Sequence, residues 1–187
     1  MSKNTSVKIK RALLSVSDKS GITELAKSLE NGGVEIVSTG GTLKHLADEG
    51  IKVKEVSDFT GSPEMMEGRV KTLHPKIHAG ILSRREKDLD EVKENFIEEI
   101  DLVVINLYPF EETVKKKVSL EETIENIDIG GPTIIRAAAK NFYYVTVLSS
   151  PENYSDFIDE FSENNKVSYE TRYELARKAF NKISEYD

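Results

Sequence analysis

ALLSVSDKSGITELAKSLENGGVEIVS (12–38) is the stretch that decides the fold, because its pattern predicts a strand, a helix and a second strand. The two ends are short apolar runs typical of buried strands. Between them, Ile22, Leu25 and Leu29 recur at helical spacing, and a glycine pair ends the helical pattern. A strand, a helix and a strand in this order predict two parallel strands joined by a right-handed crossover.

The same alternation of strands and helices continues along the chain. Further strands are expected at 53–57, 101–110 and 143–148, and helices at 41–50, 88–100, 119–127 and 131–141. This order predicts an α/β fold, a Rossmann-like three-layer sandwich with a mainly parallel sheet, over residues 1–150. Residues 151–187 are expected to be entirely helical, and they either pack on the sheet domain or connect it to a further domain.

Composition limits the classes of function. The 187 residues carry a formal net charge of −7, which disfavours sequence-independent binding to nucleic acid. The chain has no cysteine, so disulfides, thiolate nucleophiles and cysteine-based zinc sites are excluded. The N-terminus resembles no signal peptide, and no apolar run is long enough to span a membrane. We therefore expect a cytoplasmic protein whose anion sites are local basic pockets.

Two loops that follow predicted strands carry groups suited to an anion. SVSDKSG (15–21) offers hydroxyls and Lys19, and STGGT (38–42) offers glycines, hydroxyls and a helix N-terminus. Ligands of open parallel sheets bind beyond the carboxyl ends of strands, so the pair of loops suggests a phosphate cradle. Neither loop is a P-loop or a dinucleotide fingerprint, and each alone also fits ordinary turn and capping chemistry.

A basic segment, EGRVKTLHPKIHAG (67–80), stands out in this acidic chain. If its first part is extended, Arg69 and Lys71 project to the same side, where both can contact one oxyanion. The alternative is a solvated basic patch that pairs with Glu64 and Glu67.

The same segment holds His74 and His78, which are four residues apart and could share a helical face. A metal site normally needs three or four protein ligands, and the sequence offers no third ligand here. Buried or capping histidines beside a proline turn are the preferred interpretation, so no metal is expected.

INLYPF (105–110) ends the most apolar of the predicted strands. Asn106 and Tyr108 lie two residues apart, so both can face the same side and form hydrogen bonds to a ligand. Tyr108 could instead cover the core as an aromatic lid.

NIDIGGPTIIRAAAK (126–140) brings a carboxylate, a glycine pair and a helix start together. Two glycines before a proline suggest that the backbone lies against something, whereas Asp128 alone could be an ordinary residue before a helix. Lys140 stands at the far end of that helix, where it could simply complement the helix dipole.

Five motifs, LLSVSDKSG, VSTGGT, GRVKTLHPKIHAGIL, NLYPF and DIGGPTIIRAAAKN, occur in this order over nearly the whole chain. Together they resemble the inosine monophosphate cyclohydrolase domain, the N-terminal half of a bifunctional enzyme of purine biosynthesis. The resemblance implies a methylglyoxal synthase-like fold. It also implies a reaction, the dehydrative ring closure of the formylated aminoimidazole carboxamide ribonucleotide to inosine monophosphate, without cofactor or metal.

The resemblance also implies the residues of the site. The ribose phosphate would lie on Ser15, Ser17, Lys19, Thr39, Gly40, Gly41 and Thr42. The base would lie near Arg69, Lys71, Thr72, Asn106, Tyr108, Asp128, Ile129, Gly130, Gly131 and Lys140. Lys71 is expected to stabilise the developing oxyanion, helped by the backbone of 128–131, while Tyr108, Asp128 and Lys140 are expected to move protons.

Family members carry a larger C-terminal domain that performs the preceding formyl transfer, and residues 151–187 would lead into it. A homodimer is expected for the full-length enzyme, with no nucleic acid or membrane partner. Two rival functions remain open: a methylglyoxal synthase-type lyase that acts on a triose phosphate, and a regulatory module that binds a nucleotide without catalysis.

Overall fold

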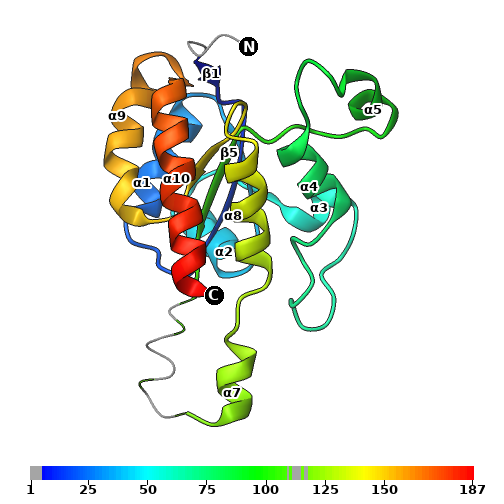
Figure 1. Ribbon diagram of the computed structural model, residues 1–187, viewed down its shortest axis with the longest axis vertical. Coiled ribbons are helices and arrows are strands. Elements are labelled where there is room, and N and C mark those ends of the chain that lie inside the picture. The colour runs from blue at the N-terminus through cyan, green and yellow to red at the C-terminus, as the bar shows by residue number, and fades with distance from the viewer. Residues whose placement is uncertain (1–5, 109, 111–114, 116–117) are drawn as a thin grey trace.

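The computed structural model describes residues 6–108, 110, 115 and 118–187, and its centre is a five-stranded sheet (Figure 1). The strands are β2 (Arg11–Val16), β3 (Glu35–Ser38), β4 (Lys54–Glu55), β5 (Leu102–Asn106) and β6 (Thr146–Leu148). Their order in space is β4-β3-β2-β5-β6, and every neighbouring pair is parallel. The α/β class and the mainly parallel sheet predicted from the sequence are confirmed.

Helices cover both faces of this sheet. They are α1 (Ile22–Asn31), α2 (Gly40–Asp48), α3 (Val56–Thr60), α4 (Pro75–Leu82), α5 (Leu89–Glu94), α7 (Leu120–Glu125), α8 (Gly130–Lys140), α9 (Tyr154–Asn164) and α10 (Tyr169–Tyr186), with a short 3-10 helix at Pro151–Asn153. Figure 1 shows α8 and α10 side by side in front of the sheet and α7 projecting from its lower end.

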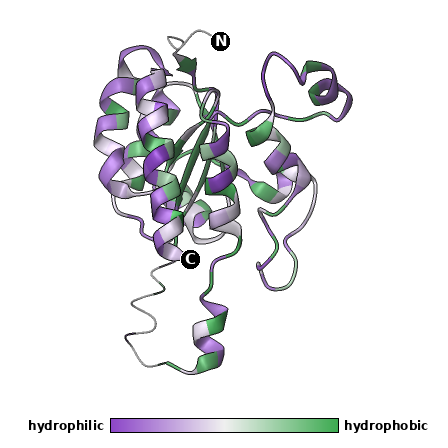
Figure 2. Cartoon of the chain, in the orientation of Figure 1, coloured by the Kyte–Doolittle hydropathy of each residue, from purple (hydrophilic) through white to green (hydrophobic). Residues whose placement is uncertain are grey.

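The core consists of two apolar clusters, one on each face of the sheet. Alternate residues of β2 point to opposite faces, so Leu14 joins α1, α2 and α9 in one cluster while Leu13 joins α3, α4 and α8 in the other. Burial on both faces explains why the central strands are almost continuously apolar, and Figure 2 shows them in green. Among the described residues, no helix combines the length and the apolar character that crossing a bilayer requires.

Several predicted elements are shorter in the structure. The strand expected at 53–57 is only β4, because Val56 already begins α3. The helix expected at 88–100 ends at Glu94, and Phe96 has a φ of 51°. None of the residues of α5 is buried, so tertiary packing does not extend this helix, and a short helix is marginal without such packing.

Residues 151–187 share the core of the sheet domain. They are not entirely helical, because β7 (Lys166–Val167) pairs antiparallel with β1 (Val7–Lys8). In addition, α9 packs on α1 and α10 packs on α8 and β6. The boundary at residue 150 stays a prediction, while packing on the sheet domain, one of the two alternatives for this segment, is what the structure shows.

A buried arginine fixes α10 to the sheet. Arg172 is 0% exposed, and its guanidinium donates to the carbonyls of Phe142 (2.9 Å), Tyr143 (3.2 Å) and Val167. One side chain therefore joins α10 to the segment between α8 and β6 and to β7. Burial lowers the pKa of Arg172, but a guanidinium remains charged in proteins.

We predict that Arg172→Met lowers the free energy of unfolding by roughly 2–5 kcal/mol, because buried carbonyls lose their charged donor. Urea denaturation followed by circular dichroism measures the change. Arg177→Met is the matched control: Arg177 is exposed on the same helix and pairs with Glu174 at 2.6 Å, so its midpoint should stay near that of the parent. Equal midpoints for the two variants would contradict the structural role of Arg172.

Candidate active site

A pocket of about 720 Å³ lies beyond the carboxyl ends of β2, β3 and β5. The strand order reverses between β2 and β5, so the loops that leave these strands diverge and open a crevice there. Every residue predicted for the site lines this pocket except Gly40 and Lys140. Side chains that lie more than 100 residues apart in the sequence therefore meet at one edge of the sheet.

Two lysines supply positive charge to the pocket. Lys19 Nζ folds back over its own loop and donates to the carbonyl oxygens of Val16 and Ser17, the latter at 3.2 Å. Burial lowers the pKa of Lys19, and the neighbouring charge of Lys71 lowers it further. Within the described ranges, neither lysine forms an ion pair with a carboxylate, so two adjacent cations are free to bind an anion.

The start of α2 lies against this charge. Gly40 has a φ of 55°, and a Cβ built on it would be 3.6 Å from Lys71 Nζ. Gly40 therefore contacts Lys71 although it does not line the pocket. Gly41 and Thr39 do line it, and the first N–H groups of the helix add a partial positive charge at this end.

Two of the predicted ligand-binding side chains hold the loops instead. Asn106 Oδ1 accepts from the N–H groups of Ser17 (2.6 Å) and Asp18 (2.9 Å), and its Nδ2 donates to the carbonyl of Asp18 at 2.9 Å. Thr42 Oγ1 both accepts from Val16 N–H and donates to Val16 O, each at 3.0 Å. In this structure these polar atoms hold the loops together, and direct contact of the two side chains with a ligand stays a prediction.

Arg69 lies at the rim of the pocket, paired with α7. Its Nε donates to Glu125 Oε1 at 3.0 Å, and its Nη2 contacts the other carboxylate oxygen. The alternative interpretation named Glu64 and Glu67 as the ion-pair partners, whereas the partner in the structure is Glu125. Its other part, a solvated Arg69, agrees with a side chain that is 65% exposed. Such an exposed pair contributes little to stability but connects the basic segment to α7 across the mouth of the pocket.

Asp128 is held by the first turn of α8. Its Oδ1 accepts from Gly131 N–H at 2.9 Å, and a Cβ on Gly131 would lie 2.6 Å from Oδ2 and 2.8 Å from Leu107 Cδ2. Only glycine fits at that position. Burial raises the pKa of the Asp128 carboxyl, while the Gly131 N–H and the charge of Lys71 act in the opposite direction.

Thr72 joins the basic segment to the same turn, because a Cβ on Gly130 would be 3.2 Å from Thr72 Oγ1. Tyr108 lines the pocket and is 51% exposed, so the alternative of an aromatic lid on the core is wrong.

Lys140 lies away from the pocket. It is exposed at the last residue of α8, about 15 Å along the helix axis from Gly130 at 1.5 Å per residue. The structure therefore does not bring it to Asp128, and its position fits a cation that complements the negative end of the helix dipole.

The histidines serve the start of α4. His74 Nδ1 accepts from Lys76 N–H at 3.1 Å, and its Nε2 lies 3.1 Å from Ser62 Oγ. His78 Nδ1 lies 3.2 Å from the His74 carbonyl. Capping beside a proline turn is confirmed, and the described part of the chain contains no cluster of three potential metal ligands.

Sequence reasoning missed the apolar part of the lining. The missed lining residues include Ile105, Ile124, Ile127 and Ile134. Ile127 and Ile129 flank Asp128 and are 45% and 61% exposed. Exposed isoleucines beside a half-buried carboxylate offer a flat apolar ligand a surface, and the alternation in NIDIGG was the only local signal of it.

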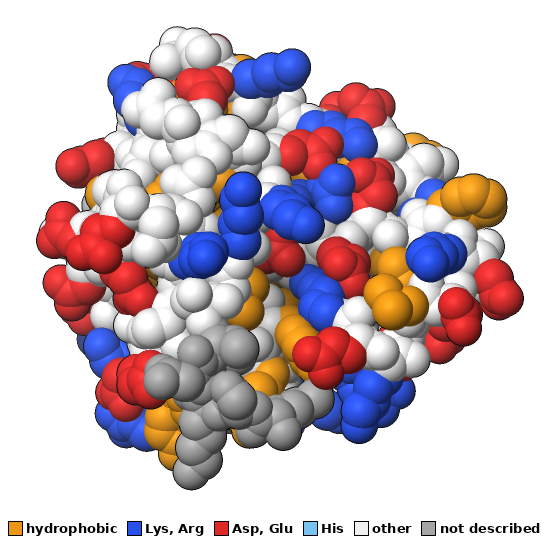
Figure 3. Space-filling view, turned by 90° about the horizontal axis from the view of Figure 1, so that it is seen from above, with side chains coloured by type: hydrophobic (Ala, Val, Ile, Leu, Met, Phe, Trp, Pro, Cys, Tyr) orange, Lys and Arg blue, Asp and Glu red, His pale blue; other side chains and the backbone are white. Residues whose placement is uncertain are grey.

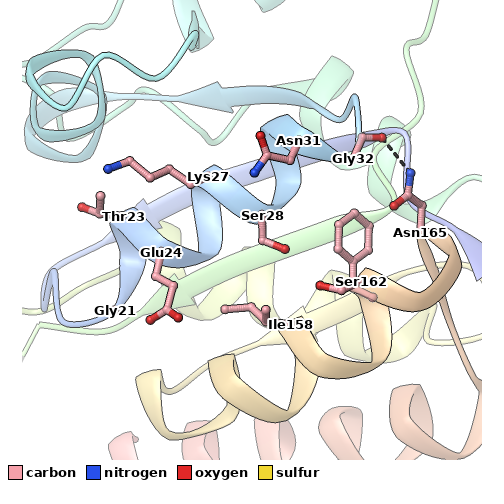
Figure 4. Close-up of a pocket in the computed structure, with 11 residues that line it drawn as sticks. Gly21, Thr23, Glu24, Lys27, Ser28, Asn31, Gly32, Ile158, Ser162 and Asn165 are labelled. Carbon is pink, nitrogen blue, oxygen red and sulfur yellow. Dashed lines mark hydrogen bonds between the residues drawn. The ribbon is translucent and has the colours of Figure 1, made fainter.

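Two other surfaces differ from this pocket. A hollow of about 740 Å³ lies between α1 and α9, where Asn165 Nδ2 donates to Gly32 O at 2.8 Å (Figure 4). It contains none of the predicted motif residues apart from Gly21. The end of the molecule near β1 shows basic and acidic side chains interspersed (Figure 3). At the start of β2, Arg11 pairs with Glu35 and Glu98.

A parallel sheet with a pocket at its switch point defines an α/β protein of the class whose ligands bind beyond the carboxyl ends of the strands. The profile of the MGS-like domain matches residues 21–133, and that of the AICARFT/IMPCHase bienzyme matches residues 138–187. The chain belongs to the MGS-like domain family, and the resemblance inferred from the five motifs is confirmed.

The similar proteins match almost the whole length of this chain. It is 56% identical over 182 residues to the bifunctional purine biosynthesis protein PurH of Acetivibrio thermocellus, covering 96% of this chain and 35% of that protein. The PurH of Clostridium acetobutylicum is 56% identical over 181 residues, with 96% and 36% covered. The chain thus spans about a third of the length of these relatives. The crystal structure of ForH superposes with a TM-score of 0.85 at 37% identity, covering 95% of this chain and 93% of that one.

We predict that Asn106→Ala speeds hydrogen exchange of the Ser17 and Asp18 amides by about tenfold or more, because both lose their acceptor. Asn106→Asp keeps the acceptor oxygen and loses only the donated bond, so its exchange should be intermediate. Asn95→Ala, which removes an exposed side chain at the end of α5, is the control. Parental exchange rates in Asn106→Ala would show that another contact holds the loop.

Proposed function

We propose that this chain is an inosine monophosphate cyclohydrolase, which closes the second ring of the formylated aminoimidazole carboxamide ribonucleotide and releases water. One observation carries the proposal: Lys19, Lys71 and Asp128 converge on a single pocket that also has an apolar wall. The two cations suit a ribose phosphate and a developing oxyanion. The isoleucines suit a flat heterocycle.

Orientation supplies a large part of the catalysis in this proposal. The carboxamide nitrogen and the formyl carbon belong to one molecule, and the nitrogen is a poor nucleophile because its lone pair is delocalised. A pocket that fixes the reactive rotamer gains much of the barrier reduction by orientation alone. The phosphate on the Lys19 side and the heterocycle against Ile127 and Ile129 would hold that rotamer.

The chemistry requires charge stabilisation and proton transfer. The nitrogen attacks the formyl carbon and its carbonyl oxygen becomes an alkoxide, which Lys71 and the N–H groups that begin α8 stabilise. The carboxamide nitrogen loses one proton as the new C–N bond forms, and the former formamide nitrogen loses another as its bond to the same carbon becomes double. The oxygen gains both protons, its C–O bond breaks, and water leaves. Asp128 accepts a proton from the carboxamide, because its raised pKa makes it a better base than an ordinary aspartate at the same pH. Tyr108 stands at the exposed side of the pocket, where it can relay a proton to the leaving oxygen. The reaction involves no redox step and no one-carbon transfer, so the proposal includes no cofactor.

The remaining part of the proposal concerns the whole protein. In relatives of PurH length, the part that this chain does not span would carry the formyl transfer, and a cytoplasmic homodimer stays a prediction. A triose phosphate lyase remains the rival, given the MGS-like fold. The apolar wall favours the larger nucleotide, because a triose phosphate has no heterocycle to cover it.

We predict that Lys71→Met lowers kcat for ring closure by about 10²–10³, because the oxyanion loses its charged partner. The formylated ribonucleotide is supplied, and the ultraviolet absorbance of the purine ring is followed. Lys27→Met is the control, since Lys27 is an exposed lysine of α1 that pairs with Glu49 at 3.7 Å. Lys140→Met should reduce kcat much less than Lys71→Met.

Three outcomes separate the candidate functions. Turnover of the ribonucleotide supports the cyclohydrolase, nucleotide binding without turnover supports a regulatory module, and methylglyoxal formed from dihydroxyacetone phosphate supports the lyase. Near-parental turnover by a correctly folded Lys71→Met variant would reject the role given to Lys71.

A further inference from the structure

Tyr186 of α10 contacts the main chain of a residue that lines the pocket. It lies in the last turn of α10 and does not line the pocket, yet its Oη accepts the backbone N–H of Asp128 at 2.8 Å. The two residues are 58 positions apart in the sequence. The bond therefore connects the C-terminal helix of the chain to the carboxylate that the proposed reaction uses as its base.

The tyrosine ring is firmly placed. It packs against the apolar cluster beneath α8, and it meets the ring of Phe110 edge-on with centroids 6.4 Å apart and planes at 65°. One turn earlier in α10, Ile183 is fully buried in the same cluster. These ring contacts hold the hydroxyl beside the main chain of Asp128.

Asp128 is consequently held at two points by different elements. Tyr186 fixes its main-chain nitrogen from α10, and Gly131 N–H fixes its carboxylate from α8. The rotamer of the carboxylate depends on both, because a displaced main chain would carry Oδ1 away from the Gly131 N–H.

We propose that Tyr186 is a positioning residue that holds Asp128 in its reactive geometry. The expected effect on the rate of ring closure rests on the proposed function. The expected effect on the position of Asp128 does not. A displacement of about 1 Å in a reacting group can cost a large part of an orientation-dependent rate. Loss of the Tyr186 hydroxyl should therefore reduce the chemical step while leaving ligand binding intact.

The charged surroundings determine the direction of the accompanying pH effect. The titratable groups around Asp128 come from every element that borders it: Lys71 and Arg69 of the basic segment, Lys19 of the β2–α1 loop, Tyr108 after β5, Glu125 of α7, and Tyr186 and Asp187 at the end of α10. Two groups lower the pKa of Asp128 against the effect of burial, the Gly131 N–H and Lys71. The hydrogen bond to Tyr186 helps to keep the first of them in place. If the main chain shifts and the bond from the Gly131 N–H weakens, the pKa of Asp128 rises further.

The test is Tyr186→Phe, which keeps the ring and removes only the hydroxyl. The matched control is Tyr173→Phe, the same change on the same helix at a side chain that is 53% exposed and lies in an aromatic cluster away from the pocket. We expect kcat for ring closure to fall roughly two- to tenfold in Tyr186→Phe, the range that one hydrogen bond supplies, with KM within about twofold of the parent. The acidic limb of the kcat–pH profile should move to higher pH.

A second readout does not depend on activity. The carboxyl carbon of Asp128, assigned by comparison with Asp128→Asn, is titrated by nuclear magnetic resonance in both Tyr→Phe variants. An upward shift of its pKa in Tyr186→Phe and none in Tyr173→Phe supports the proposal, even if the parent protein fails to convert the ribonucleotide and the proposed function is rejected. An Asp128 titration that matches the parent overturns it, including the case in which Tyr186→Phe merely lowers the melting temperature.

Discussion

The site depends on the parallel pairing of β2 with β5, in which Ser15 lies beside Ile105 and Val16 beside Asn106. This register sets the ends of two strands from distant parts of the sequence at the same height. Asn106 can then reach the β2–α1 loop with all the polar atoms of its amide, and the cradle for an anion is built from one strand end against another. A shift of one residue would turn these side chains to opposite faces of the sheet, because side chains alternate along a strand.

Like charges lie close together in the pocket. Burial is the main cause of the lowered pKa of Lys19, and repulsion from Lys71 adds to it, while the charge of Asp18 opposes both. The fixed N–H groups of two helix starts add to the positive potential. Asp128 is the carboxylate that these charges favour, while its burial opposes ionisation. If the proposed function holds, a phosphate bound beside the two lysines would reduce this repulsion. This arrangement also confines strong positive potential to one edge of a protein whose net charge is −7.

The order of strands and helices, the loops that form the pocket and most of its lining could be predicted from the sequence, because periodicity, glycine pairs and strand ends are local signals. The hydrogen-bond partner of each polar atom could not be predicted. Asn106 and Thr42 have partners 26 to 89 residues away, and no local pattern states that a side chain holds a loop and not a ligand. The distance of Lys140 from Asp128 could not be predicted either. A motif gives only the position of a residue in the sequence, whereas the length of α8 sets how far the two side chains lie apart. Tyr186 was missed because its hydroxyl acts across a contact between two helices.

The pairing of β1 with β7 bears on how this chain reaches its native state during synthesis. β1 leaves the ribosome about 160 residues before its partner strand β7, at the observed register of Val7 with Val167. The hydrogen bonds of Arg172 also form late, because the carbonyls of Phe142 and Tyr143 have no Arg172 to bind until α10 has been made. A nascent chain would therefore expose the surfaces of α8 and β6 on which α10 packs until α10 itself has been made.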